Sequence, residues 1–164
     1  MPEKKTTERA QKDKREGKSA STQAGEYVHE EIDHVRKGKH GARSAKQAIA
    51  IGLSKARRAG VKLAPPKKGT ASKATREKAQ HDSAAGEKGK KKVSSTRSRA
   101  TSSALKREGH SAASPKALSK QAKSSAAKRT ASSRSAAAKK AAKTKGPAAR
   151  SAAAKKAAKT RAKS

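Results

Sequence analysis

The stretch that decides the fold is SAKQAIAIGLSKARRAG, residues 44–60. Ser44 followed three residues later by Gln47 is a capping box, in which both side chains satisfy backbone groups at a helix start. Gly60 stands where a left-handed residue ends a helix, with Val61 placed to pack back on Ala56. The residues of one helix face between these ends are apolar or small; they are Ala45, Ala48, Ile49, Gly52, Leu53 and Ala56. We therefore predict a helix over 44–59.

The preceding residues predict a partner helix over 22–37. Its apolar stripe recurs at steps of four and three residues and consists of Ala24, Val28, Ile32 and Val35, flanked by Tyr27. Thr22 is the expected N-cap and Gly38 the expected C-terminal stop. Together the two helices form a predicted hairpin domain, residues 22–66, with Val28, Ile32, Ile49 and Leu53 at the centre of its core. About 40 residues is near the lower limit for a stable domain, so we expect marginal stability, self-association of the hairpin, or ordering on a partner.

Composition argues against a larger core. The 164 residues carry a net charge of +33, only 30% are hydrophobic, and Tyr27 is the sole aromatic residue. Ordinary globular chains are about 45–50% apolar, and a compact state of such charge repels itself. We therefore predict a mostly disordered chain with all-α elements: a charged N-terminal segment (1–21), the hairpin, a basic linker (67–109) and a cationic tail (110–164).

The tail is rich in Ala, Lys and Ser and has no acidic residue. After Glu108 the chain has 16 Lys and Arg, 20 Ala and 10 Ser. An 11-residue sequence, residues 134–144, recurs exactly as residues 150–160, and Gly146-Pro147 between the copies is an expected break in any helix. Upstream, Ser114-Pro115 predicts a helix start, with Ser114 as N-cap. Ala favours a helix, but Lys139 and Lys143 repel each other at i, i+4. We therefore predict a conditionally helical tail, disordered when free and helical when a polyanion neutralises its Lys rows.

A surplus of cations that cannot be paired within the chain indicates a polyanionic partner, and nucleic acid is the most abundant one. One Tyr excludes an aromatic stacking platform, and the absence of Asn excludes Asn–adenine pairing. We expect histone-like binding of double-stranded DNA through its phosphates, independent of sequence, with bridging or compaction. The alternatives are an RNA- or ribosome-associated protein and a disordered stress or desiccation protectant.

The candidate contacts are cations of the hairpin, the linker and the tail, where they cluster or follow the repeat. These nucleic-acid-binding candidates are Lys39, Arg43, Lys55, Arg57, Arg58, Lys90, Lys91, Lys92, Lys128, Arg129, Arg134, Lys139, Lys140, Lys143, Lys145, Arg150, Lys155, Lys156, Lys159 and Arg161. For the turn that contains Lys39 and Arg43, a dedicated phosphate site and a simple turn are equally good interpretations. His40 there is either a turn residue or a phosphate contact.

Other kinds of site are not expected. His29 and His34 are separated by five residues, whereas a helical metal site of the HExxH kind needs four, so we predict no metal and no cofactor. The Ser and Thr residues lack an accompanying base, so we predict no enzymatic activity. There is no Cys, no signal-like apolar segment and no apolar run of membrane-spanning length. The expected location is the cytoplasm, in association with a nucleoid.

Two resemblances agree with this interpretation. Residues 110–164 resemble the arms of bacterial histone H1-like proteins and the C-terminal domain of linker histones in composition. Residues 25–60, from GEYV through KHGARSAKQAIAIGL to RRAG, are similar to a family of small basic bacterial proteins labelled DNA-binding or plasmid-stabilisation. The resemblance implies a bacterial source and no catalytic residue.

Overall fold

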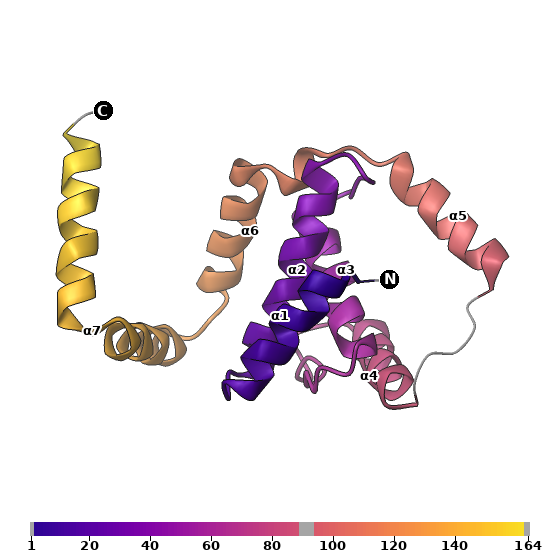
Figure 1. Cartoon of the computed structure of the whole chain (residues 1–164), viewed down its shortest axis with the longest axis horizontal. Helices are drawn as coiled ribbons and strands as arrows, with labels where there is room; N and C mark the ends of the chain where they lie inside the picture. Colours follow the sequence, from indigo (N-terminus) through magenta and orange to yellow (C-terminus); the bar gives the residue numbers. More distant parts are fainter. Residues whose placement is uncertain (1, 89–93, 163–164) are drawn as a thin grey trace. The chain divides into compact units, whose positions relative to one another are not determined.

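The computed structural model describes residues 2–88 and 94–162, and within these ranges the secondary structure is helical except for one isolated bridge between Lys68 and Ala71. The chain divides into two compact units, residues 1–121 and 122–164. The elements, drawn in Figure 1, are α1 (Lys4–Arg15), α2 (Ala20–Arg36), α3 (Ala45–Arg58), α4 (Lys73–Glu87), α5 (Ser95–Lys106), the short 3-10 helix η1 (Ser111–Ala113), α6 (Pro115–Ala127) and α7 (Ala131–Arg161). The prediction of a mostly disordered chain is therefore wrong: the described chain is all-α and largely helical.

Helix α3 begins and ends where its sequence signals stand. The Ser44 side chain accepts a hydrogen bond from the Gln47 N–H at 3.2 Å. The Gln47 side chain reaches back one residue further than a standard capping box does, and accepts from the Arg43 N–H at 2.8 Å. Gly60 has a φ of +85°, and the Val61 N–H then donates to the Ala56 carbonyl at 3.1 Å. These local bonds explain why both ends of α3 could be predicted.

Helix α2 is longer than predicted at its N-terminus. Its cap is Ser19, whose hydroxyl accepts from the Thr22 N–H at 3.3 Å, so the prediction of Thr22 as N-cap is wrong. The C-terminal stop is at Gly38, as predicted, with a φ of +70°. The Lys39 N–H donates to the His34 carbonyl at 3.0 Å, which turns the chain back toward α2.

The buried face of α2 is rotated from the predicted stripe. Ala24, Tyr27, Glu31 and Val35 are each at most 1% exposed, whereas Val28 and Ile32 are only half-buried. Ile49 and Leu53 of α3 are half-buried as well. The predicted centre of the core is therefore wrong, because Glu31, a charged residue, occupies one turn of the innermost face.

Helix α1 covers part of α2, although no apolar stripe was found in residues 1–21. Ala10 is 3% exposed and lies in one cluster with Ala24, Tyr27, Ala56 and Val61. Figure 1 shows α1 beside α2. The charged N-terminal segment of the predicted disordered chain is therefore part of the fold, because the large Tyr27 ring supplies the apolar surface that α1 lacks.

A second cluster joins the hairpin turn to a segment about 70 residues further along the chain. Val35, Ala42 and Ala48 pack with Ala112 and Ala113 of η1. Backbone bonds reinforce this contact: the N–H groups of residues 41 and 42 donate to the carbonyls of residues 105 and 109, at 2.9 and 3.0 Å. The segment 105–113, predicted as linker and tail, thus contributes to the fold of residues 1–121.

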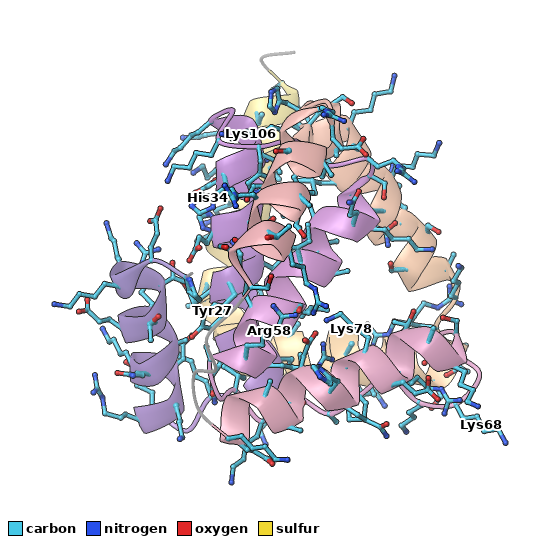
Figure 2. All side chains as sticks on the ribbon, turned by 90° about the vertical axis from the view of Figure 1, so that its right-hand side faces the viewer. Tyr27, His34, Arg58, Lys68, Lys78 and Lys106 are labelled. Atoms are coloured by element: carbon cyan, nitrogen blue, oxygen red, sulfur yellow. The ribbon has the colours of Figure 1, made fainter. Side chains whose placement is uncertain are left out.

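Asp82 of α4 fastens that helix to α3. Its side chain is buried and accepts hydrogen bonds from Ser54 Oγ at 2.6 Å, Arg58 Nε at 2.8 Å and Lys78 Nζ at 3.0 Å; Figure 2 labels Arg58 and Lys78. Burial raises the pKa of the Asp82 carboxyl, but the three hydrogen bonds outweigh burial, and the pKa lies below its ordinary value. The charged form of Asp82 therefore stabilises the fold.

We expect Asp82→Asn to lower the free energy of unfolding by about 1.5–3 kcal/mol at pH 7, the range for hydrogen bonds to charged groups. Because the folded pKa is depressed, the stabilisation is complete above the unfolded pKa of about 3.9 and is lost as pH falls through the folded pKa. The difference between wild type and variant should therefore shrink below about pH 4. Urea unfolding at several pH values measures it, with exposed Glu87→Gln on the same helix as control. A difference that persists unchanged in acid would contradict this account.

Residues 122–164 also contradict the prediction of a free, disordered tail, since α7 is helical without a partner. Thirteen of its 31 residues are Ala, which favours the helix over Ser or Thr by up to about 0.7 kcal/mol per residue. Repulsion between Lys side chains at i, i+4 costs only about 0.2–0.5 kcal/mol per pair. The sum of these two contributions favours the helix, so the tail does not need a polyanion in order to become helical.

Candidate nucleic-acid interface

Helix α7 consists of two helical segments joined at a break. Thr130 caps the first segment by accepting from the Ser133 N–H at 3.2 Å. The break is at Gly146, with φ 69° and ψ 168°. Pro147 follows; it has no N–H and disfavours the α conformation in the residue before it. Gly146-Pro147 was predicted to interrupt the helix, and the structure has the interruption there.

The two segments contain the two copies of the 11-residue repeat in the same local conformation. Thr144 Oγ1 donates to the Lys140 carbonyl at 2.9 Å, and Thr160 Oγ1 donates to the Lys156 carbonyl at 3.0 Å. In both copies three Lys occupy i, i+1 and i+4 and share one side of the helix. The repeat therefore presents the same cationic row twice.

The described cations of this unit are exposed to solvent. The sequence-predicted residues among them are Lys128, Arg129, Arg134, Lys139, Lys140, Lys143, Arg150, Lys155, Lys156, Lys159 and Arg161. No acidic side chain follows Glu108, so none of these cations has an acidic neighbour within its own unit. Two of the Arg side chains donate hydrogen bonds to residues four positions away. Arg129 donates to the Ser133 hydroxyl and carbonyl, and Arg150 Nε donates to the Gly146 carbonyl at 3.2 Å.

Further cations were missed because they are spaced among Ser and Ala rather than clustered. Lys116, Lys120 and Lys123 of α6 are exposed, as are Arg97 and Arg99 of α5. Neither helix has a fully buried residue. Ser114 caps α6 with its hydroxyl 3.2 Å from the Ala117 N–H, and this Ser-Pro start was the sequence signal for the helix.

The cations predicted at the end of α3 are engaged within the fold instead. Arg57 is 7% exposed and donates to the carbonyls of Leu63 and Ala64, and burial lowers its pKa. Arg58 contacts Asp82, and Lys55 lies 3.6 Å from Glu30 and also pairs with Glu31. These three side chains stabilise the folded unit through contacts within it, so we do not count them in the candidate interface.

The remaining predicted residues are in the turn before α3 or outside the described part. Lys39 Nζ lies 2.7 Å from Glu3 Oε1, and hydrogen bonds from Lys39 and then His34 lower the pKa of Glu3 to about 2. Arg43 is largely exposed, with Nη2 3.4 Å from Glu108 Oε1. Lys90, Lys91 and Lys92, and the side chain of Lys145, lie outside the described residues.

These features describe a small helical unit followed by an exposed cationic helix. Residues 14–68 match the model of DUF6496, a family of unknown function. The match begins within α1, contains α2 and α3 completely, and ends before α4. No curated protein and no solved structure matches the chain. In the part of the chain that the structure describes, no helix is both long and apolar enough to cross a membrane.

Proposed function

We propose that this protein binds double-stranded DNA through the phosphate backbone, independent of base sequence, with α7 as the main contact. The observation that carries the proposal is the surface of α7: ten of its 31 residues are Lys or Arg, none is acidic, and Pro147 is its one apolar residue larger than Ala. A helix of this composition attracts polyanions such as the phosphates of nucleic acid.

The charge density of α7 is suited to partial neutralisation of a duplex. At 1.5 Å per residue its two segments extend about 45 Å in total, which gives about one cation per 5 Å. Double-stranded DNA carries one negative charge per about 1.7 Å. One such helix therefore offsets about a third of the phosphate charge along its length and leaves charge for further copies.

Two other classes of partner fit the surface less well. A helix that lies on a membrane needs an apolar face of large side chains, and α7 has none. A reader of unpaired bases needs exposed aromatic side chains, and the single aromatic residue, Tyr27, is 1% exposed. The break at Gly146 gives α7 two arms, which could follow one duplex or join two and so compact DNA. On this proposal the protein is found with DNA, as a cytoplasmic, nucleoid-associated protein.

The test is a salt titration of binding to two unrelated duplexes of equal length. If about ten cations contact phosphates, log affinity should fall against log salt with a slope near −9. The two duplexes should bind within a few-fold of each other. Competition with structured RNA at fixed salt separates DNA from RNA as the preferred target. A slope near zero, or weak binding at physiological salt, would contradict the proposal and favour a protectant.

A further inference from the structure

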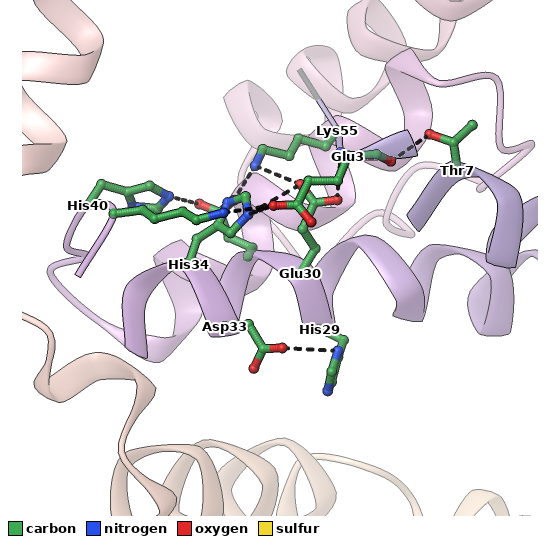
Figure 3. A network of polar contacts seen from close by, with 10 residues as sticks. Glu3, Thr7, His29, Glu30, Asp33, His34, His40 and Lys55 are labelled. Atoms are coloured by element: carbon green, nitrogen blue, oxygen red, sulfur yellow. Dashed lines mark hydrogen bonds and ion pairs between the residues drawn. The ribbon is translucent and has the colours of Figure 1, made fainter. Parts of the chain in front are cut away.

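A second polar site lies in the folded unit, over the C-terminal half of α2, and its three members are Glu31, His34 and His40. Glu31, His34 and His40 each direct a ligand atom into one space, and these atoms all lie within 4.8 Å of one another. Glu31 is fully buried, and the two imidazole side chains are 13% and 17% exposed. Figure 3 shows His34 and His40 together, with His29 and Asp33 on the other side of α2.

The turn after α2 creates this cluster. Glu31 and His34 are three residues apart and therefore neighbours on the helix surface. The left-handed Gly38 reverses the chain, so that His40 returns over the last turn of α2. The rings of His34 and His40 are then 6.0 Å apart at an angle of 88°. The sequence suggested only the pair His29 and His34, because the position of the third member of this group, His40, depends on the turn.

The buried carboxylates are short of positive charge. Glu3, Glu30 and Glu31 contribute three negative charges to the network, and Lys39 and Lys55 contribute two positive ones. Glu30 Oε1 and both carboxylate oxygens of Glu31 are buried without a hydrogen bond. Buried charge is costly unless it is paired, and the two buried carboxylates, Glu30 and Glu31, share the single cation Lys55.

The hydrogen bond of His40 Nδ1 indicates that the missing positive charge belongs beside Glu31. His40 Nδ1 lies 3.0 Å from the Gly41 carbonyl, which can only accept, so Nδ1 carries the proton. In neutral His40 the other ring nitrogen, Nε2, then carries a lone pair and no proton. This nitrogen lies 3.3 Å from Glu31 Oε1. Two acceptors at this distance are held together either by a proton or by a metal ion between them. A metal-bound His usually donates its other ring N–H to such a carbonyl, which orients the imidazole.

We infer that Glu31, His34 and His40 bind one divalent transition-metal ion of the Zn²⁺ class. Carboxylate and imidazole ligands are those that Zn²⁺ takes, and three protein ligands leave the fourth position to water or to the nearby Glu3. Lys55, which pairs with Glu31 Oε2, orients the carboxylate from outside. A pocket of about 210 Å³ adjoins the site at His34, with Glu3 and Glu30 also in its lining, whereas Glu31 and His40 do not line it. The ion ties the turn after α2 to the helix itself.

The experiment uses the full chain without an affinity tag. Calorimetric titration with Zn²⁺ should show one equivalent bound, with Mg²⁺ as a control that prefers oxygen ligands. His34→Gln and His40→Gln should each weaken Zn²⁺ binding by about 100-fold, since even loss of a supporting residue costs about 10- to 100-fold. The matched controls are His29→Gln and His81→Gln, which change exposed His residues outside the site and should bind as wild type does.

Two measurements on metal binding by the wild type test the site even if a His variant fails to fold. Co²⁺ added to wild type should give the visible absorption of a tetrahedral ion at one equivalent. Added Zn²⁺ should raise the melting temperature of wild type and of His29→Gln. No Zn²⁺ binding by wild type, or no tetrahedral Co²⁺ spectrum, would overturn the inference. Binding that survives in His40→Gln would overturn it as well.

Discussion

Replacing the three Lys of both repeats with Gln is expected to lower the affinity for double-stranded DNA by about 10⁴-fold at 0.15 M salt. Each phosphate contact contributes about 0.9 to the salt slope, which at this salt corresponds to about fivefold in affinity. Six contacts therefore account for about 10⁴-fold, and the slope should fall from about −9 to about −4. The residues changed are Lys139, Lys140, Lys143, Lys155, Lys156 and Lys159.

The identity of the two repeats gives the experiment an internal comparison. Changing the Lys of residues 134–144 alone, or those of residues 150–160 alone, should cost about 10²-fold each, because the local geometry is the same. Gln has nearly the helix propensity of Lys, so circular dichroism should show α7 intact in every variant. Unequal losses would mean that one segment contacts the duplex and the other does not.

The matched control removes an equal charge from the folded unit. Lys4, Lys12 and Lys73 are exposed and stand at i, i+4 from Glu8, Glu16 and Glu77, at 3.8–3.9 Å. Their joint replacement by Gln changes the net charge by the same three units as one repeat does. We expect at most a few-fold loss of affinity. A loss equal to that of one repeat would show that net charge, and not α7, controls binding.

The sequence predicted those parts of the fold that depend on local bonds. The caps at Ser44 and Ser114 and the stops at Gly38, Gly60 and Gly146 involve residues within five positions of one another. The hairpin α2–α3 was predictable because its helices begin and end at such signals. The repeat and its exposed cations were predictable for the same reason, since neither requires a contact with another element.

The parts that the sequence did not predict depend on contacts between distant segments. Helix α1 is held by Tyr27, and η1 by Val35, Ala42 and Ala48, and neither contact leaves a periodic pattern in the attached segment. Glu31 escaped notice because a charged residue is not expected on the innermost face of a helix. The disorder prediction failed for another reason: net charge was weighed more heavily than the sum of many small Ala propensities.

The closest approach between α2 and α3 depends on one residue without a side chain. Gly52 of α3 is buried, and a Cβ atom there would lie 2.6 Å from the Val28 Cα and 3.0 Å from the Tyr27 carbonyl oxygen. Both obstacles are backbone atoms of α2, so no rotamer change removes the overlap. The two helices would have to separate, which would loosen the contacts of Tyr27 and Ala56 with the same core cluster.

We therefore expect Gly52→Ala to lower the free energy of unfolding by about 2–3 kcal/mol, the upper part of the range for overpacking. Gly25 is the matched control: it lies inside α2, and nothing is within 4 Å of its added Cβ. Gly25→Ala should raise the free energy of unfolding by about 0.5–1 kcal/mol, because Ala restricts the unfolded chain and favours the helix. Urea unfolding followed by the fluorescence of Tyr27, the sole aromatic residue, reports on this part of the chain alone. Effects of the same sign in both variants would show that helix propensity, and not the close approach of α2 and α3, determines the outcome at Gly52.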